Sequence, residues 1–377
     1  MDHGHAAAQL IIAASESDAN LYYATGFRAP DPFVFVSIKG EKILLMSDLE
    51  VDRARAEARV DTVLRIRTYE DRATVAGLSR PRLTDAAIAF LNERGVTVVV
   101  VPGAFPIEYG DALRARGITV QVRPEPFFEE RLVKAPAEVE SIVVAMRRTE
   151  AALGAAIGAI RDAEVVGGVL RWRGDTLTAE ALKRLIAVRL LQDGLLAQHT
   201  IVACGDATYD PHNEGSGPLR SGQPVIIDIF PQDETTRYFA DITRTVVKGR
   251  APDALRQMYR AVAEAQECAF HRIRDGADGE AVHREVQVTL EAHGFQTGVV
   301  NGRMQGFFHG TGHGLGLELH ELPRVSRVPT TLRTGNVVTV EPGLYYPGVG
   351  GVRIEDVVVV TEHGCSNLTV YPKTLEV

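Results

Sequence analysis

The chain has 377 residues, of which 45% are hydrophobic and 24% charged, which is enough for two or three soluble domains with sizeable cores. Acidic residues outnumber basic ones by 49 to 41, the net charge is −8, and the lack of a long basic run argues against nucleic acid as a partner. Three scattered cysteines without a Cys-x-x-Cys pair argue against a disulfide framework and a thiolate zinc site.

In chain order, the first residues, Met1–His5, lack the basic stretch and the long apolar core of a signal peptide. The longest apolar runs, such as 96–101, are far shorter than the ~20 residues that cross a bilayer. Together with the sparse cysteines, these features predict a cytoplasmic protein that does not associate with membranes.

The first part of the chain alternates strand-like and helix-like segments. Residues 33–38 and 43–46 are rich in β-forming side chains and flank a glycine-containing turn, which predicts a hairpin. Residues 83–94 have helical spacing, and the unbroken β-branched run at 96–101 predicts a strand buried on both faces. We expect a small α/β domain over residues 1–130 that holds no catalytic constellation.

The segment 131–136 marks the predicted domain boundary, because Pro136 is well suited to open a helix. Further along, helical patterns are expected at about 136–163, 178–192, 252–274 and 278–293, and three of them are followed by a glycine. Strand pairs are expected within 225–247, 337–346 and 351–361. The second domain, residues 137–377, is therefore predicted to be α+β, with long helices packed on an antiparallel sheet.

Two aspartates stand out in the β-rich segments 224–230 and 237–243. If these strands pair about the midpoint of Glu234 and Thr235, Asp228 and Asp241 lie directly opposite each other, with Cβ atoms ~5 Å apart. Two carboxylates at that distance repel each other unless a cation lies between them or they share a proton.

A similar pattern recurs near the C-terminus, where Glu341 and Glu355 flank a glycine-rich turn centred on residue 348. They are candidates for a second opposed pair, because an acid in an apolar strand is costly unless it is paired or metal-bound. Between the two hairpins, the run 307–321 holds four glycines and three histidines, which indicates backbone packed close to a site. His212 adds a fourth histidine shortly before the first hairpin.

Taken singly, each of these residues is better explained by capping, solvent exposure or a structural role. Together, four carboxylates and one imidazole suit a pair of divalent ions with a shared water. Oxygen-rich ligation favours Mn²⁺, Co²⁺, Zn²⁺ or Fe²⁺ over a structural zinc, and ions ~3.5–4 Å apart lower the pKa of a bridging water. Glu321 and Asp356 directly follow candidate site residues, so we expect their side chains to face away from the site.

These residues match a known family. The chain resembles the pita-bread metallopeptidases, specifically the Xaa-Pro dipeptidases (prolidases) and Xaa-Pro aminopeptidases. Segments 20–27 and 131–138 resemble the start of a creatinase/prolidase-type N-terminal domain and the junction that follows it. In the catalytic domain the resemblance is carried by 241–245, 309–323 and 340–356.

The resemblance implies a pita-bread catalytic domain at 137–377, an antiparallel sheet covered by helices, after a creatinase/prolidase-like N-terminal domain at 1–130. It implies two divalent metal ions, with Mn²⁺ expected first and Zn²⁺, Co²⁺ or Fe²⁺ as alternatives. Asp241 and Glu355 then bridge both ions, and Glu341 binds one ion and shuttles the proton of the bridging water. The full set of implied ligands is Asp228, Asp241, His313, Glu341 and Glu355.

The resemblance also implies roles for residues that face the substrate. His212 and His320 match histidines that stabilise the tetrahedral intermediate and assist the leaving group. His309 matches a pocket histidine near the proline side of the substrate. Arg324 matches a position that binds the free carboxylate of a dipeptide in some prolidases. Arg353 matches a position near the site that orients ligands. The implied partners are proline-containing dipeptides or short peptides and a second copy of the chain in a homodimer.

One departure concerns the segment from Asp228 to Asp241, which is two residues longer than is usual in the family. An even insertion keeps both carboxylates on one face of the hairpin, but we expect the longer turn to reshape the rim of the pocket.

The sequence therefore predicts a dinuclear-metal peptidase that hydrolyses Xaa-Pro bonds, with a lean to dipeptides. The N-terminal domain disfavours a methionine aminopeptidase, and the five ligand types disfavour a metal-free creatinase-like hydrolase. An Xaa-Pro aminopeptidase acting on longer peptides and a non-catalytic pita-bread binding protein stay open.

Overall fold

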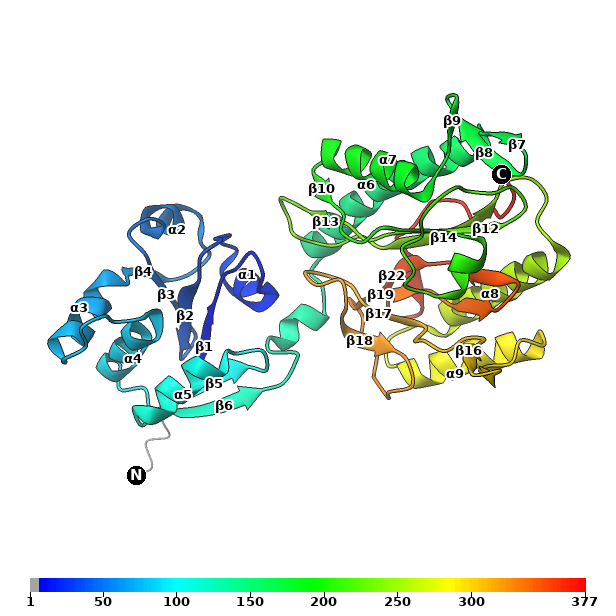
Figure 1. The fold of residues 1–377 in the computed structure, drawn as a ribbon. Coiled ribbons are helices and arrows are strands. Elements are labelled where there is room, and N and C mark those ends of the chain that lie inside the picture. Colours follow the sequence, from blue (N-terminus) through cyan, green and yellow to red (C-terminus); the bar gives the residue numbers. More distant parts are fainter. Residues whose placement is uncertain (1–6) are drawn as a thin grey trace. The chain divides into compact units, whose positions relative to one another are not determined.

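A computed structural model describes residues 7–377 as two compact units, of which the first ends at Arg131 and the second runs from Leu132 to Val377 (Figure 1). Each unit buries its own hydrophobic core. Over the same described range, no helix is both long enough and apolar enough to cross a bilayer.

The first unit, over residues 7–131, is a six-stranded sheet with helices on both faces. The strand order is β4-β3-β2-β1-β5-β6, antiparallel from β1 to β3 and parallel elsewhere. Its elements are β1 (Ala8–Ala13), α1 (Ala19–Thr25), β2 (Phe33–Ile38), β3 (Glu41–Met46), α2 (Val51–Glu57), β4 (Thr62–Arg65), α3 (Arg67–Val75), α4 (Leu83–Glu93), β5 (Val98–Pro102), α5 (Ile107–Ala115) and β6 (Thr119–Arg123).

Alternation along the strands explains the two helical layers of this unit. Val34 and Val36 of β2 point to one face and join the core under α3, α4 and α5. Phe33 and Phe35 point to the other face and pack with α1 and α2. The predicted hairpin (β2–β3), helix (α4) and buried strand (β5) are confirmed.

The second unit contains the longer helices. Its elements are α6 (Pro136–Arg161), β7 (Glu164–Val166), β8 (Val169–Trp172), β9 (Asp175–Thr176), α7 (Ala179–Gln192), β10 (Leu195–Leu196), β11 (Ile201–Cys204), β12 (Pro224–Ile229), β13 (Gln232–Asp233), β14 (Ile242–Val247), α8 (Asp253–Arg272), α9 (Gly279–Ala292), β15 (Gly298–Val300), β16 (Arg303–Gln305), β17 (Gly312–Gly314), β18 (Glu321–Val325), β19 (Val337–Val340), β20 (Gly343–Tyr346), β21 (Gly350–Arg353), β22 (Asp356–Val360) and β23 (Cys365–Asn367).

Two helix pairs enclose the central strands of this unit (Figure 1). α6 and α7 pack against each other and against the sheet β11-β12-β14, while α8 and α9 pack on the side of β17, β18, β19 and β21. The α+β architecture of helices covering antiparallel strands is therefore confirmed, as are the four predicted helices.

The start of α6 follows from its local sequence. Pro136 occupies the first turn, where a missing N–H costs nothing, and the Glu138 carboxylate accepts the Ala135 N–H at 2.7 Å. Ile142, Met146 and Leu153 recur at helical spacing and are fully buried.

The predicted register of the hairpin formed by β12 and β14, here called the aspartate hairpin, is wrong by two residues. Asp228 lies opposite Thr243, so Asp241 is its diagonal neighbour on the same face. The cause is the turn: the Asp233 carboxylate accepts the backbone N–H groups of Thr235 and Thr236, and Arg237 adopts a left-handed φ of 66°. The turn is thus centred one residue later than the sequence suggested.

The predicted register of residues 337–360, here called the glutamate hairpin, is confirmed. Val340 pairs with Asp356, and Gly343 pairs with Arg353, so both ladders share one register. Glu341 and Glu355 lie opposite each other in the break between these ladders. Gly348 and Gly350, with φ of 80° and 108°, make the tight turn that fixes this register.

Candidate metal centre

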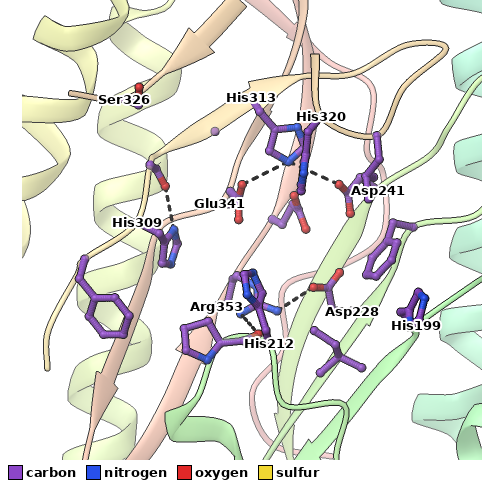
Figure 2. Close-up of a pocket in the computed structure, with 18 of the residues that line it drawn as sticks. His199, His212, Asp228, Asp241, His309, His313, His320, Ser326, Glu341 and Arg353 are labelled. Carbon is purple, nitrogen blue, oxygen red and sulfur yellow. Dashed lines mark hydrogen bonds and ion pairs between the residues drawn. The ribbon is translucent and has the colours of Figure 1, made fainter. Parts of the chain in front are cut away.

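All ten residues that the sequence predicts for the site line one pocket of the second unit, with a volume of about 740 Å³ (Figure 2). The pocket is thus lined by residues from both hairpins, from the segment before β12 and from residues 307–321, here called the histidine loop. The ten residues are His212, Asp228, Asp241, His309, His313, His320, Arg324, Glu341, Arg353 and Glu355.

The tightest group consists of Asp241, His313 and Glu355, each of which offers one ligand atom within 4.8 Å of the others. All three side chains are buried. The Nε2 atom of His313 lies 3.4 Å from Glu341 Oε1 and 3.8 Å from Asp241 Oδ2. Asp228 lines the same pocket but is not a member of the group of three.

The orientation of His313 suits a ligand. Its Nδ1 lies 3.1 Å from the Gly314 carbonyl, so the ring donates its N–H there and directs the Nε2 lone pair at the carboxylates. Gly312 and Gly314 are required on either side, because a Cβ at these positions would lie 1.9 Å from the Thr339 carbonyl oxygen and 2.4 Å from the Leu322 carbonyl oxygen. The predicted close backbone packing in the histidine loop is confirmed here.

Asp228 is held from one side only. Its Oδ2 accepts Arg353 Nη2 at 2.7 Å, whereas its buried Oδ1 has no hydrogen-bond partner among the described residues. A buried carboxylate oxygen without a partner costs free energy unless a cation or water meets it. This orphaned oxygen supports a cation in the pocket.

Thr243 links the two hairpins. Its hydroxyl donates to Glu355 Oε2 at 2.7 Å, and its carbonyl accepts the Glu355 N–H at 3.1 Å. Glu341 is fixed independently, because its N–H donates to the Thr311 carbonyl at 2.7 Å. The positions of both glutamates are therefore set by backbone as well as side-chain bonds.

The electrostatics of the pocket call for added positive charge. Burial raises the pKa of Asp241 well above its usual range, and the neighbouring Glu355 raises it further. Burial and the nearby Glu341 do the same to the pKa of Glu355. Burial also lowers the pKa of His313 to about 3, so its imidazole is neutral. The lone pair on Nε2 can therefore bind a metal ion. Four acids and a neutral imidazole fit divalent cations.

A second network connects the pocket wall to Asp228. The His309 Nδ1 donates to the Gly310 carbonyl at 2.8 Å, so its Nε2 accepts the Tyr345 hydroxyl at 3.0 Å. The same hydroxyl accepts Arg353 Nη1 at 2.9 Å. Arg353 therefore joins the predicted pocket histidine to a predicted ligand.

Tyr345 was missed by the sequence reasoning, although a signal was present. In the glutamate hairpin, Gly343 pairs with Arg353, so Tyr345, two residues further on, shares the face of Arg353. A fully buried tyrosine needs a partner for its hydroxyl, and the arginine on the same face supplies one.

Three predicted substrate-facing residues lie at the pocket mouth and are exposed: His212, His320 and Arg324. The His320 ring lies 4.2 Å from the His313 ring, centroid to centroid, and Figure 2 shows the two side by side. His212 is set by its own N–H, which donates to the Asp210 carboxylate at 3.1 Å.

Glu321 and Asp356 do not line this pocket. Glu321 pairs with Lys134 at 2.5 Å, and Asp356 pairs with Arg244 at 2.8 Å, with all four side chains buried. Two further pocket residues, His199 and Glu214, went unnoticed in the sequence because nothing local marks them.

Comparisons with known proteins identify relatives of both units. Residues 140–362 match metallopeptidase family M24, and residues 4–115 match the creatinase/prolidase N-terminal domain. The chain is similar to an Xaa-Pro dipeptidase of Pyrococcus furiosus, with 33% identity over 63% of each chain. It is also similar to an Xaa-Pro dipeptidase of Pyrococcus horikoshii, with 37% identity over 45% of this chain and 46% of that one.

The matched regions span less than two thirds of these curated relatives' own length. Among solved structures, an X-Pro aminopeptidase from Thermotoga maritima MSB8 has a TM-score of 0.81, with 98% of this chain and 97% of that chain covered. At 23% identity, this likeness shows a shared fold.

Proposed function

The chain belongs to metallopeptidase family M24, and from that premise we propose that it is a dinuclear-metal peptidase that cleaves the bond between an N-terminal residue and proline. The observation that carries the proposal is the buried group of Asp241, His313 and Glu355, which shares a pocket with Asp228 and Glu341. The similarity to two Xaa-Pro dipeptidases supports the choice of substrate.

The residues that would hold two divalent ions are Asp228, Asp241, His313, Glu341 and Glu355. Bound there, such ions supply Lewis acidity, which lowers the pKa of a water and stabilises negative charge on the attacked carbonyl oxygen. The identity of the ions is part of the proposal: Mn²⁺ first, with Zn²⁺, Co²⁺ or Fe²⁺ as alternatives.

The chain's own groups orient the substrate and move protons. The Glu341 carboxylate takes the proton of the attacking water and passes it to the leaving proline nitrogen. His320, beside His313 at the pocket mouth, donates to the developing oxyanion, and His212 assists the leaving group. Proline offers no N–H, so recognition depends on the ring and on the chain beyond it, on the side of His309.

A lean to dipeptides rests on Arg324, whose guanidinium is exposed in the pocket and suits a free carboxylate. The alternative is an Xaa-Pro aminopeptidase acting on longer peptides, which the fold shared with the Thermotoga maritima protein supports. Comparing turnover of Ala-Pro with that of a longer peptide beginning Ala-Pro separates the two.

A homodimer and a cytoplasmic location are also part of the proposal. Light scattering of the purified protein tests whether it is a dimer.

The test of the proposed function is Ala-Pro hydrolysis by the purified protein with added Mn²⁺. Asp241→Ala is expected to lower kcat/KM by at least about 10³-fold, because ~4 kcal/mol of lost transition-state stabilisation has that effect. Asp175→Ala, the same substitution on an exposed strand, serves as the control and should retain activity. Undiminished turnover by Asp241→Ala would contradict the proposal, and a protein that binds metal without cleaving any peptide would favour the non-catalytic alternative.

A further inference from the structure

The pocket has a second end that the site described above does not use. Figure 2 shows His309 and His199 on opposite sides of the candidate ligands Asp228, Asp241 and Glu341. If the proline ring lies toward His309, as the proposed function requires, the residue before the scissile bond extends toward His199. The side chains at that end therefore meet the first residue of the substrate.

The floor of this end is apolar and follows from strand pairing. Ile201 of β11 is the direct partner of Asp228 in β12, and it is buried. Phe230 directly follows β12 and lines the same pocket as Asp228. Both side chains line the pocket, where they offer a surface to an aliphatic stem.

The far edge of this end carries a histidine and a carboxylate in hydrogen-bond contact. His199 Nδ1 lies 2.9 Å from Glu214 Oε1, and the two side chains are 75% and 49% exposed. Both residues line the pocket, so a ligand can reach them. The pair joins the segment just before β11 to the loop before β12, 15 residues further along the chain.

The backbone under Glu214 is held firmly, so its carboxylate stays at the edge. The Glu214 carbonyl accepts the Val202 N–H at 3.1 Å, and the Gly215 carbonyl accepts Lys183 Nζ at 3.0 Å. A Cβ at Gly215 would lie 1.8 Å from the Val202 carbonyl oxygen, so the loop packs directly on β11. His199 adopts a left-handed φ of 57°, which is uncommon for a residue other than glycine.

The other acids of the pocket have different partners. Asp228, Asp241, Glu341 and Glu355 belong to the candidate metal centre, and Asp210 accepts the His212 N–H. Glu214 faces an exposed imidazole, which the cationic end of a substrate side chain can displace. We propose that Glu214 selects a positively charged side chain, lysine or arginine, at the first residue of the substrate, and that His199 competes with it.

This inference rests on the proposed function for the direction of the peptide. A lysine side chain places four methylene groups over Ile201 and Phe230 and ends in an ammonium group at Glu214. The contact is partly exposed, so the expected preference is modest, about two- to fivefold. High salt weakens it, because exposed charges are screened.

The experiment compares kcat/KM for Lys-Pro and norleucyl-proline, whose first side chains share a four-carbon stem and differ in the terminal ammonium group. The wild type is expected to favour Lys-Pro by about two- to fivefold, and Glu214→Gln to treat the two dipeptides alike. His199→Asn, which tolerates the left-handed backbone, is expected to enlarge the preference by up to about twofold because the competing imidazole is gone. Glu291→Gln, on the exposed surface of α9, is the matched control and should retain the wild-type ratio.

An unchanged ratio in Glu214→Gln, or a wild type that does not distinguish the two dipeptides, would overturn the inference. If the wild type cleaves Ala-Pro while these ratios fail, the proposed function stands and only this inference falls. If no Xaa-Pro dipeptide is cleaved, the proposed function fails. The inference is then tested by calorimetric binding of Lys-Pro and norleucyl-proline to the wild type and to Glu214→Gln. Equal affinities of the wild type for the two dipeptides would overturn it.

Discussion

The aspartate hairpin and the glutamate hairpin bring carboxylates to one pocket by different means. In the aspartate hairpin the ladder runs unbroken past Asp228, which is neutralised by the buried Arg353. In the glutamate hairpin the ladder breaks at the two acids, and Glu355 is held by a neutral hydroxyl from Thr243. Arg353 belongs to the glutamate hairpin and Thr243 to the aspartate hairpin, so each hairpin supplies the partner of an acid in the other. Asp228 receives a positively charged partner from the protein, whereas Glu355 receives a neutral one and its charge is left for a cation.

This contrast predicts the largest effect for Asp228→Asn in the metal-free protein. Arg353 would keep a buried charge without its counterion, so the free energy of unfolding is expected to fall by roughly 3–5 kcal/mol. Urea denaturation measures it. Asp48→Asn, which removes an exposed ion pair with Arg65, should cost less than ~1 kcal/mol. Equal losses in the two variants would show that Arg353 does not depend on Asp228.

Thr243→Val breaks the hydroxyl bridge between the hairpins and keeps the shape of the side chain. It removes the donor to Glu355 and the acceptor of Arg353 Nε at 3.3 Å. Mn²⁺ affinity, measured by calorimetry, is expected to fall by about 10-fold, as for other groups that orient ligands. Thr149→Val removes a hydroxyl buried on α6, away from the pocket, and should leave metal affinity unchanged. Equal metal affinities for Thr243→Val and the wild type would argue against coupling of the two hairpins.

The glutamate hairpin has a pH-sensitive support in α9. His283 Nδ1 lies 2.9 Å from Thr311 Oγ1, and the Thr311 carbonyl accepts the Glu341 N–H. Burial, followed by the positive charge of Arg327, lowers the pKa of His283 from its ordinary 6.5 to about 4. As the pH falls, His283 is therefore protonated in the unfolded chain at a higher pH than in the folded protein. The contribution of the neutral ring to the free energy of unfolding is fully present above pH 6.5 and is lost as the pH falls toward 4.

The check is urea denaturation of the wild type and His283→Gln at several pH values. Between neutral pH and about pH 5, the wild type is expected to lose about 2 kcal/mol more than the variant, since one pKa unit corresponds to ~1.4 kcal/mol. Parallel stability curves for the two proteins would mean that His283 does not contribute this pH dependence.

The smallest effect is expected for Glu355→Gln, and it has the opposite sign. Burial and the neighbouring Glu341 disfavour the charged form of Glu355, so removing this charge is expected to raise slightly the free energy of unfolding of the metal-free protein. Mn²⁺ affinity should fall in the same variant, because a ligand charge is lost. A variant that is destabilised as strongly as Asp228→Asn would remove the distinction between the hairpins.

The hairpins also show what the sequence could predict. The register of the glutamate hairpin was correct because Gly348 and Gly350 define a tight turn. The register of the aspartate hairpin was wrong because the Asp233 side chain and the left-handed Arg237 shift the turn by one residue, which local composition does not reveal. The ligand face was still right, since a shift of two residues preserves the face.

Contacts between segments that are far apart in the chain could not be predicted from the sequence. Thr243 meets Glu355, and His199 meets Glu214, only because separate strands and loops converge on the pocket. Neither threonine in a strand nor histidine in a loop carries a chemical signal by itself. Residue types and strand pairing predicted the four candidate carboxylates and the family resemblance added His313, whereas the groups that orient these side chains depend on tertiary packing.

The metal content of the purified protein tests the central claim most directly. After loading with Mn²⁺ and removal of free ions, mass spectrometric metal analysis of the wild type is expected to give two ions per chain. Asp241→Ala, which removes a proposed ligand from the group with His313 and Glu355, is expected to give less than one. A wild type that holds no metal, or an Asp241→Ala variant that holds as much as the wild type, would contradict a dinuclear centre at these residues.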